Sequence, residues 1–232
     1  MKLMRGDGPL LRIGHRGAAA LAPANSIAAI EAALEAGVDL VELDVLGAPD
    51  RALVLGHSRR ELGAEPATLD DAFELLAGHN PTTGLIADIK VAGRERELVE
   101  GLRRHGLIER AVASTSRAGT LQTLRRLEPG LARSRTYPRG RLYPWQRITK
   151  RLTLPFRIER LLTEAEAWAM TLDHRLVSRG AVARCHALGA AVFAWTVNDR
   201  ARLEQLDRLG VDGVITDDPR IFRSGYGATL QA

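Results

Sequence analysis

Residues 38–46 read Val-Asp-Leu-Val-Glu-Leu-Asp-Val-Leu, an apolar run in which two acidic residues, Glu42 and Asp44, lie two positions apart. Successive residues of a β-strand point to opposite faces, so these carboxylates share one face while Val41 and Leu43 share the other. Two carboxylates on one face of a buried strand repel each other and lose hydration. A divalent cation bound between them would remove both costs. The alternative is that a carboxylate is exposed at the strand end or paired with an arginine.

Strand-like runs alternate with helix-like segments on both sides of this stretch. The alternation predicts a parallel sheet, and about eight such units fit a closed α/β barrel, (β/α)8, better than an open sheet. The run at 52–57 is different, because it can continue the preceding strand as a hairpin and need not be a barrel stave. The expected strands are 11–15, 39–46, 52–57, 84–90, 110–115, 131–137, 168–173, 190–197 and 212–216. The expected helices are 25–36, 69–78, 94–105, 118–128, 178–188 and 199–209.

Polar and aromatic side chains recur where the expected strands end. In (β/α)8 barrels, functional residues lie at the C-terminal ends of the strands. Asp88 and Lys90 again lie two apart, so they share one strand face. The residues at or near these strand ends are His15, Arg16, Glu42, Asp44, His57, Asp88, Lys90, Trp195 and Asp217. We therefore expect these side chains to meet at one rim of the barrel.

Five short motifs follow one another along the chain. They are His15-Arg16-Gly17, Glu42-Leu43-Asp44, His57 at a strand end, Trp195-Thr196-Val197-Asn198 and Thr216-Asp217-Asp218-Pro219. The combination resembles the glycerophosphodiester phosphodiesterase family over nearly the whole chain, from about residue 12 to residue 222. The resemblance implies a metal-dependent enzyme on a TIM barrel that hydrolyses glycerophosphodiesters to sn-glycerol 3-phosphate and an alcohol. It also implies that Asp88 is the third metal ligand.

The chain departs from the family pattern in several places. Ala24 and Ser58 stand where the family usually has an acid, and Asp88 stands where it usually has Glu. The stretch between His57 and Asp88 is short, so we expect a shortened family insertion after the second strand. These departures affect substrate choice and turnover more than reaction class. They leave two alternatives open: a lysophospholipase-D-like hydrolase of lysophospholipids, and a non-catalytic barrel that binds phosphate or lipid.

Cleavage of a phosphodiester near neutral pH requires neutralised phosphoryl charge, an activated nucleophile and a protonated leaving group. Oxygen ligands from Glu42, Asp44 and Asp88 favour Mg²⁺ or Ca²⁺ over zinc. Imidazoles can divide the acid and base roles, whereas guanidinium and ammonium groups bind phosphate. The catalytic candidates are therefore His15 and His57, and the substrate-binding candidates are Arg16, Lys90 and Trp195.

Each of these assignments has a structural alternative. Arg16 could be only the counter-ion of Glu42, and Lys90 could only pair with Asp88. A lone histidine is more often structural than catalytic. Trp195 could belong to the core rather than to a pocket wall. Asp217 could cap the turn that follows it.

Composition and charge fit one globular domain, residues 1–232, that acts on anions. The chain is 45% hydrophobic and 26% charged, and its net charge of +5 favours phosphates or membrane surfaces as partners. The single cysteine, Cys185, is expected to be a buried hydrophobe. The N-terminus lacks the apolar segment of about 7–15 residues that marks a signal peptide. We expect a cytoplasmic protein or one at the periphery of a membrane.

Residues 133–160 differ from the rest of the chain. They contain nine Lys or Arg, a single acid, Glu159, and four interleaved aromatic residues. Aromatic side chains favour the membrane interface and cations favour anionic lipid. No nucleic-acid-binding motif accompanies the pattern, so we expect no nucleic-acid partner. Two interpretations stay open: a loop that contacts an anionic membrane surface, and a solvated basic loop over the barrel mouth.

Overall fold

The computed structural model describes residues 2–48, 52–63, 65–140 and 142–223, and strands alternate with helices along them as predicted. The strands are β1 (Leu11–Gly14), β2 (Leu40–Gly47), β3 (Leu53–Leu55), β4 (Gly84–Ile89), β5 (Ala111–Thr115), β6 (Ala132–Tyr137), β7 (Ala169–Asp173), β8 (Ala191–Trp195) and β9 (Gly213–Thr216). The helices are α1 (Ile27–Glu35), α2 (Leu69–Gly78), α3 (Glu95–Arg104), α4 (Ala118–Leu127), α5 (Pro144–Ala165), α6 (Arg179–Ala187) and α7 (Arg200–Arg208), with short 3-10 helices η1 (Ile108–Arg110) and η2 (Pro219–Phe222).

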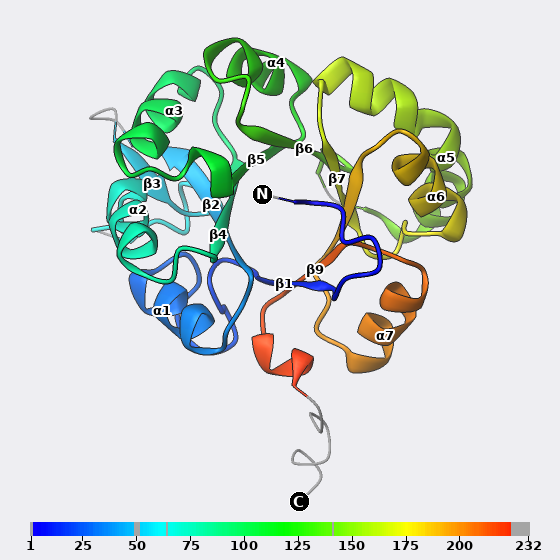
Figure 1. The fold of residues 1–232 in the computed structure, drawn as a ribbon, viewed down its shortest axis with the longest axis horizontal. Coiled ribbons are helices and arrows are strands. Elements are labelled where there is room, and N and C mark those ends of the chain that lie inside the picture. The colour runs from blue at the N-terminus through cyan, green and yellow to red at the C-terminus, as the bar shows by residue number, and fades with distance from the viewer. Residues whose placement is uncertain (1, 49–51, 64, 141, 224–232) are drawn as a thin grey trace, which may run out of the picture.

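Eight parallel strands close into a barrel with the helices on its outside (Figure 1). The order around the ring is β1-β9-β8-β7-β6-β5-β4-β2, and pairing of β1 with β2 completes it. The (β/α)8 TIM-barrel prediction is therefore confirmed. Strand β3 lies outside the ring and pairs antiparallel with the end of β2, as expected for a hairpin. Between β3 and α2, the described residues form no helix and only the isolated bridge of Val54 with Thr68.

The alternation along β2 places its two faces in different environments. Val41 and Leu43 point outward and pack with Phe73 of α2 in the core between sheet and helices. Leu40 points inward and belongs to a second apolar cluster inside the barrel. Glu42 follows on that inward face, closer to the C-terminal end of the strand.

The same two-layer arrangement recurs around the barrel. An apolar layer fills the interior with Ile13, Leu40, Ile86, Val112, Ala169, Phe193 and Ile215. Six of these seven strand segments carry a polar or aromatic residue two positions further along, on the same face. These residues are His15, Glu42, Asp88, Ser114, Thr171 and Trp195. The N-terminal segment crosses the opposite opening, where Leu3 is buried in the same apolar cluster (Figure 1). Polar side chains from neighbouring strands therefore gather at the C-terminal mouth of the barrel.

The expectation of a loop over residues 133–160 is wrong for most of this range. Arg133 and Arg135 lie on β6, and the 22-residue helix α5 begins at Pro144. Arg133 is buried, and its guanidinium donates to the carbonyls of Pro129, Leu131 and Glu166. Residue 141 of the range lies outside the described residues.

Two features of the sequence explain why helix α5 was not predicted. Pro155 lies inside it, and an internal proline usually predicts a helix break. Apolar residues also occur on both its faces, so the two sets together show no simple period of 3.6. The inner set, Leu154, Ile158, Leu161, Leu162 and Ala165, is buried against the barrel. Among the described residues, no helix is long and apolar enough to cross a membrane.

Candidate active site

Three carboxylates converge at the mouth because β2 and β4 are neighbours in register. Asp44 lies opposite Asp88 in the parallel pair, and Glu42 precedes Asp44 on the same inward face. One oxygen from each of the three lies within 4.8 Å of the others, and Glu42 and Asp44 are almost completely buried. The predicted cluster of Glu42, Asp44 and Asp88 is thus present in the structure.

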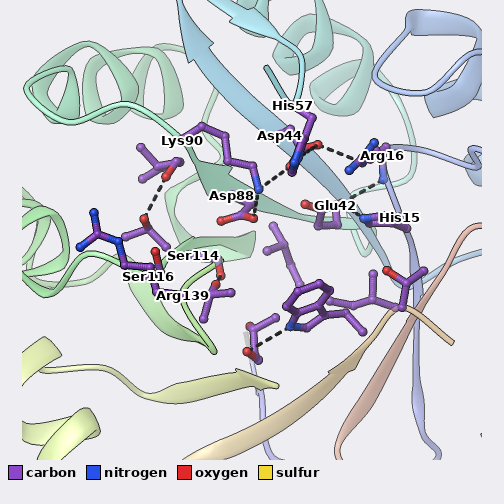
Figure 2. Close-up of a pocket in the computed structure, with 18 of the residues that line it drawn as sticks. His15, Arg16, Glu42, Asp44, His57, Asp88, Lys90, Ser114, Ser116 and Arg139 are labelled. Carbon is purple, nitrogen blue, oxygen red and sulfur yellow. Dashed lines mark hydrogen bonds and ion pairs between the residues drawn. The ribbon is translucent and has the colours of Figure 1, made fainter. Parts of the chain in front are cut away.

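Two cations lie against this cluster (Figure 2). Lys90 Nζ is 2.7 Å from Asp44 Oδ1 and also pairs with Asp88. Arg16 Nε is 3.0 Å from Asp44 Oδ2, while the backbone N–H of Arg16 donates to Glu42 Oε2 over 2.9 Å. Both cations therefore have Asp44 as an ion-pair partner. Glu42 interacts with the backbone of Arg16 rather than with its side chain, contrary to the counter-ion alternative.

The loop between β1 and α1 is folded tightly to place Arg16 in this position. Arg16 has a φ of 51° and Gly17 a φ of 86°, both in the left-handed region. A Cβ on Gly17 would lie 2.5 Å from the backbone of Ala29 in α1, so only glycine fits this close approach. The geometry of the turn therefore explains why glycine is the last residue of the His-Arg-Gly motif.

Asn25 holds Asp44 from the other side, a role that the sequence did not reveal. Its Nδ2 donates to Asp44 Oδ2 over 3.1 Å, and its Oδ1 accepts from the Asp44 backbone N–H over 3.0 Å. Asn25 and Ser26 both precede α1, and either residue type can cap a helix. In the structure Ser26 is the cap, which leaves the Asn25 side chain available for Asp44. His57, which follows β3, adds an Nδ1 contact of 3.1 Å to Asp44 Oδ2.

His15 lies beside Glu42, whereas His57 lies beside Asp44 (Figure 2). Its Nδ1 is 2.6 Å from Asp217 Oδ1, and its Nε2 is 3.9 Å from Glu42 Oε2. Asn198 donates to the other oxygen of Asp217 over 2.5 Å and accepts from the Asp217 backbone N–H. Asp217 therefore orients His15, and the cap before Pro219 is Asp218.

The three carboxylates have different pKa values because their surroundings differ. Burial and the charge of Asp44 raise the pKa of Glu42 to about 7. Burial also raises the pKa of Asp88, against the opposing charge of Lys90. Burial disfavours the ionised form of Asp44, but His57, Lys90 and Arg16 outweigh it and lower the pKa of Asp44. With all three carboxylates ionised, the cluster would carry one negative charge more than Lys90 and Arg16 neutralise.

The imidazole of His15 is also perturbed. Burial alone would lower the pKa of His15, but the hydrogen bond with Asp217 and the charge of Glu42 raise it above the ordinary value. A histidine with a raised pKa retains its proton at higher pH and can donate it. Such a group is suited to proton transfer near neutral pH.

A cavity of about 610 Å³ opens in front of the cluster. Its wall includes Trp195, whose Nε1 donates to the carbonyl of Thr171 over 3.3 Å. Arg117 and Arg139, which sequence reasoning missed, add two further cations to the lining. Arg117 follows the C-terminal end of β5, and Arg139 follows that of β6. A basic residue just after a barrel strand is a candidate for the mouth, so this position could have identified both. All eight predicted site residues line this cavity: His15, Arg16, Glu42, Asp44, His57, Asp88, Lys90 and Trp195.

Comparison with known proteins agrees with this geometry. The model of the glycerophosphoryl diester phosphodiesterase family matches residues 15–75 and 68–221. A glycerophosphodiester phosphodiesterase from Caldanaerobacter subterraneus is 25% identical, covering 90% of this chain and 94% of the relative.

Solved structures share the fold. A phosphodiesterase from Oleispira antarctica, in complex with the product sn-glycerol-3-phosphate, has a TM-score of 0.73 at 22% identity and 97% coverage of both chains. A glycerophosphodiester phosphodiesterase from Agrobacterium tumefaciens has a TM-score of 0.74 at 19% identity, covering 92% of this chain and 99% of that one. Because the family model matches most of its length, this chain belongs to the glycerophosphoryl diester phosphodiesterase family and is a phosphoric diester hydrolase.

Proposed function

We propose that residues 1–232 form one domain that hydrolyses glycerophosphodiesters to sn-glycerol 3-phosphate and an alcohol, with a divalent cation held by Glu42, Asp44 and Asp88. The observation that carries the proposal is the convergence of these carboxylates with two cations and two imidazoles on one cavity. The product complex of the Oleispira antarctica relative supports the same substrate class.

The residues present fit a hard cation. All three donors are carboxylate oxygens within 4.8 Å of one another, the donor set that Mg²⁺ and Ca²⁺ prefer. Burial is the main cause of the raised pKa values of Glu42 and Asp88, and a bound cation would favour the ionised form of both carboxylates. When bound, the cation supplies positive charge beside the phosphoryl group.

The remaining side chains of the mouth would bind the diester and move its protons. Arg16 presents a guanidinium for the phosphoryl oxygens, and Lys90 adds a compact positive charge. One imidazole would take a proton from the nucleophile, and the other would give a proton to the leaving alkoxide. His15 is held for this task by Asp217, and His57 by Asp44.

Trp195 would provide an apolar wall for the glycerol or alkyl part of the substrate. Its indole is half-buried at the cavity and fixed by its hydrogen bond to Thr171. A fixed aromatic surface adds contact area at little entropic cost.

A second candidate is hydrolysis of lysophospholipids in the manner of a lysophospholipase D. One observation favours it: the apolar outer residues Tyr143 and Trp145, at the start of α5, follow the loop that brings Arg139 to the cavity. Such a position could support an acyl chain while the headgroup enters the mouth.

One assay separates the candidates. Glycerophosphocholine, glycerophosphoethanolamine and lysophosphatidylcholine are each incubated with chelator-treated protein and then with Mg²⁺, Ca²⁺ or Mn²⁺, and release of the alcohol is measured. We expect release from the glycerophosphodiesters with at least one cation and none after chelation. Release from the lysophospholipid alone would favour the second candidate. Binding of the diesters without release under every condition would leave only a non-catalytic barrel.

A further inference from the structure

The outer face of α5 carries an exposed apolar stripe. Trp145, Ile148, Leu152 and Phe156 are 73%, 74%, 68% and 89% exposed. Their spacing of three and four residues puts them on one side of the helix, over a length of roughly 16 Å. The inner set of leucines and isoleucine occupies the opposite side. Exposed apolar patches of this kind mark contact with a partner or a membrane.

A basic pocket adjoins this stripe. It has a volume of about 310 Å³ and is lined by Arg147, Ile148, Arg151, His174, Arg175 and Arg202. Ile148 belongs to both features, so the pocket and the stripe form one continuous surface. The pocket lies at the C-terminal end of β7 and at the first turns of α5 and α7, and therefore at the same end of the barrel as the cavity.

The positive charge of this pocket is only partly neutralised. Arg175 binds Asp173 through two hydrogen bonds of 2.8 and 2.6 Å. Within the described part of the chain, no carboxylate pairs with Arg147, Arg151 or Arg202, although the Arg202 guanidinium donates hydrogen bonds to His174 and Gln205. The Nε of Arg147 is buried and has no hydrogen-bond partner among the described residues. A buried donor without an acceptor is costly, so the Arg147 guanidinium is not stabilised there by the surrounding described residues.

The charges of the pocket also act on one another. Burial, together with the charges of Arg202, Arg175 and Arg147, lowers the pKa of His174 in spite of the nearby Asp173. Burial and the charge of Arg151 likewise lower the pKa of Arg202. An anion placed among these groups would relieve this repulsion.

We propose that α5 is a membrane-docking helix, whose apolar stripe enters the interfacial region of an anionic bilayer while the basic pocket holds the phosphate of a lipid headgroup. The occupant is assigned by complementarity: the apolar stripe favours an apolar phase, and the adjacent Arg147 and Arg151, which have no carboxylate partner among the described residues, favour anions at the border of that phase. A bilayer of anionic phospholipid provides both. The proposal does not rest on the catalytic function, because docking is measured without turnover.

Docking in this way would have a consequence for substrate access. The loop between β6 and α5 contributes Arg139 to the cavity wall before α5 begins. A membrane bound along α5 would therefore lie beside the mouth of the barrel. Diesters released from lipids at that surface would reach the cavity over a short path.

Vesicle co-sedimentation tests the proposal with the full chain. Vesicles of phosphatidylcholine with phosphatidylglycerol are compared with vesicles of phosphatidylcholine alone, at low and at high salt. We expect binding to the anionic vesicles that weakens with salt, because exposed charges are screened. The pocket variant Arg147→Gln/Arg151→Gln should bind roughly 30-fold more weakly at low salt, since each cation near a lipid surface contributes about a fivefold factor.

Two further variants separate a specific surface from general attraction. Ile148→Ser/Phe156→Ser removes half of the stripe and should reduce binding about tenfold or more at every salt concentration. Arg126→Gln/Arg208→Gln removes the same charge as the pocket variant from the C-terminal ends of α4 and α7, far from the pocket, and should bind as the wild type does.

Several outcomes would overturn the proposal. Wild-type protein that fails to sediment with anionic vesicles would do so, and so would an equal loss of binding in the Arg126/Arg208 control. A dimer in analytical ultracentrifugation that the Ile148/Phe156 variant abolishes, without vesicle binding by the wild type, would assign the stripe to a second copy of the chain. Thermal unfolding of each variant verifies that a loss of binding is not a loss of fold.

Discussion

The barrel mouth and the outer face of α5 both depart from the usual distribution of side chains, in opposite directions. The mouth buries charge: Glu42 and Asp44 are almost inaccessible to solvent. Helix α5 exposes apolar surface instead, with Phe156 89% exposed. Buried charges are tolerated only with partners, and exposed apolar patches persist only when they serve contact with something else.

The two regions also differ in where their partners are. At the mouth most partners belong to the chain itself, because Asn25, His57, Lys90 and Arg16 all contact Asp44. The stripe of α5 has no such covering residues among those the structure describes. The mouth is therefore a prepared site for a small ligand, whereas the α5 surface is suited to an extended one.

The largest effect is expected from removing the imidazoles at the mouth. His15→Ala and His57→Ala should each lower kcat on the order of 10²–10⁴-fold, the usual contribution of general acid–base catalysis. Stability should change little, because neither side chain belongs to an apolar cluster. Steady-state kinetics on glycerophosphocholine and thermal unfolding measure the two quantities. Full activity in His15→Ala would contradict the assignment.

The next effect concerns the cation. Glu42→Gln keeps the shape of the side chain but removes one of the three carboxylates, so affinity for Mg²⁺ or Ca²⁺ should fall on the order of 100-fold or more. Isothermal titration calorimetry without substrate gives this affinity independently of turnover. Glu74→Gln, at an exposed carboxylate of α2 outside the cluster, is the matched control and should retain wild-type affinity. Equal affinities for the two variants would contradict the cation site.

A smaller effect on kcat is expected from Asp217, which acts through His15. Asp217→Asn keeps a hydrogen-bond partner for His15 but removes its charge, so kcat should fall about 10- to 100-fold, as for other residues that orient a functional histidine. Cation affinity should not change, because Asp217 does not belong to the carboxylate cluster. The loss in His15→Ala/Asp217→Asn should equal that in His15→Ala alone. Additive losses would mean that Asp217 acts by another route.

The mouth was accessible to sequence reasoning because strand periodicity alone determines where its side chains point. Leu40, Glu42 and Asp44 share one face of any strand, and barrels place the C-terminal part of that face at the mouth. Asp217 could not be decided in this way, since its partner His15 is 202 positions away and Asp218 beside it could serve as the cap equally well. Asn25 was missed because an asparagine before a helix usually predicts a cap.

Helix α5 was missed for a related reason. Periodicity reveals a helix when one face is apolar, but Trp145 and Phe156 add apolar positions to the solvent side. From the sequence alone, Pro155 predicts a helix break, although in the structure it lies inside the helix. A helix with apolar residues on both faces therefore loses the periodic signal that usually identifies it.

The smallest effect is expected at Leu152, and it sharpens the contrast between the two faces of α5. Leu152 is 68% exposed, and Leu154, two residues away, is completely buried. Leu152→Ala should change the free energy of unfolding by no more than about 0.5 kcal/mol, as exposed substitutions do. Leu154→Ala should cost about 2–5 kcal/mol because it leaves a cavity against the barrel. Urea denaturation measures both, and a loss at Leu152 as large as that at Leu154 would mean that the stripe is already covered by the protein itself, as in a dimer.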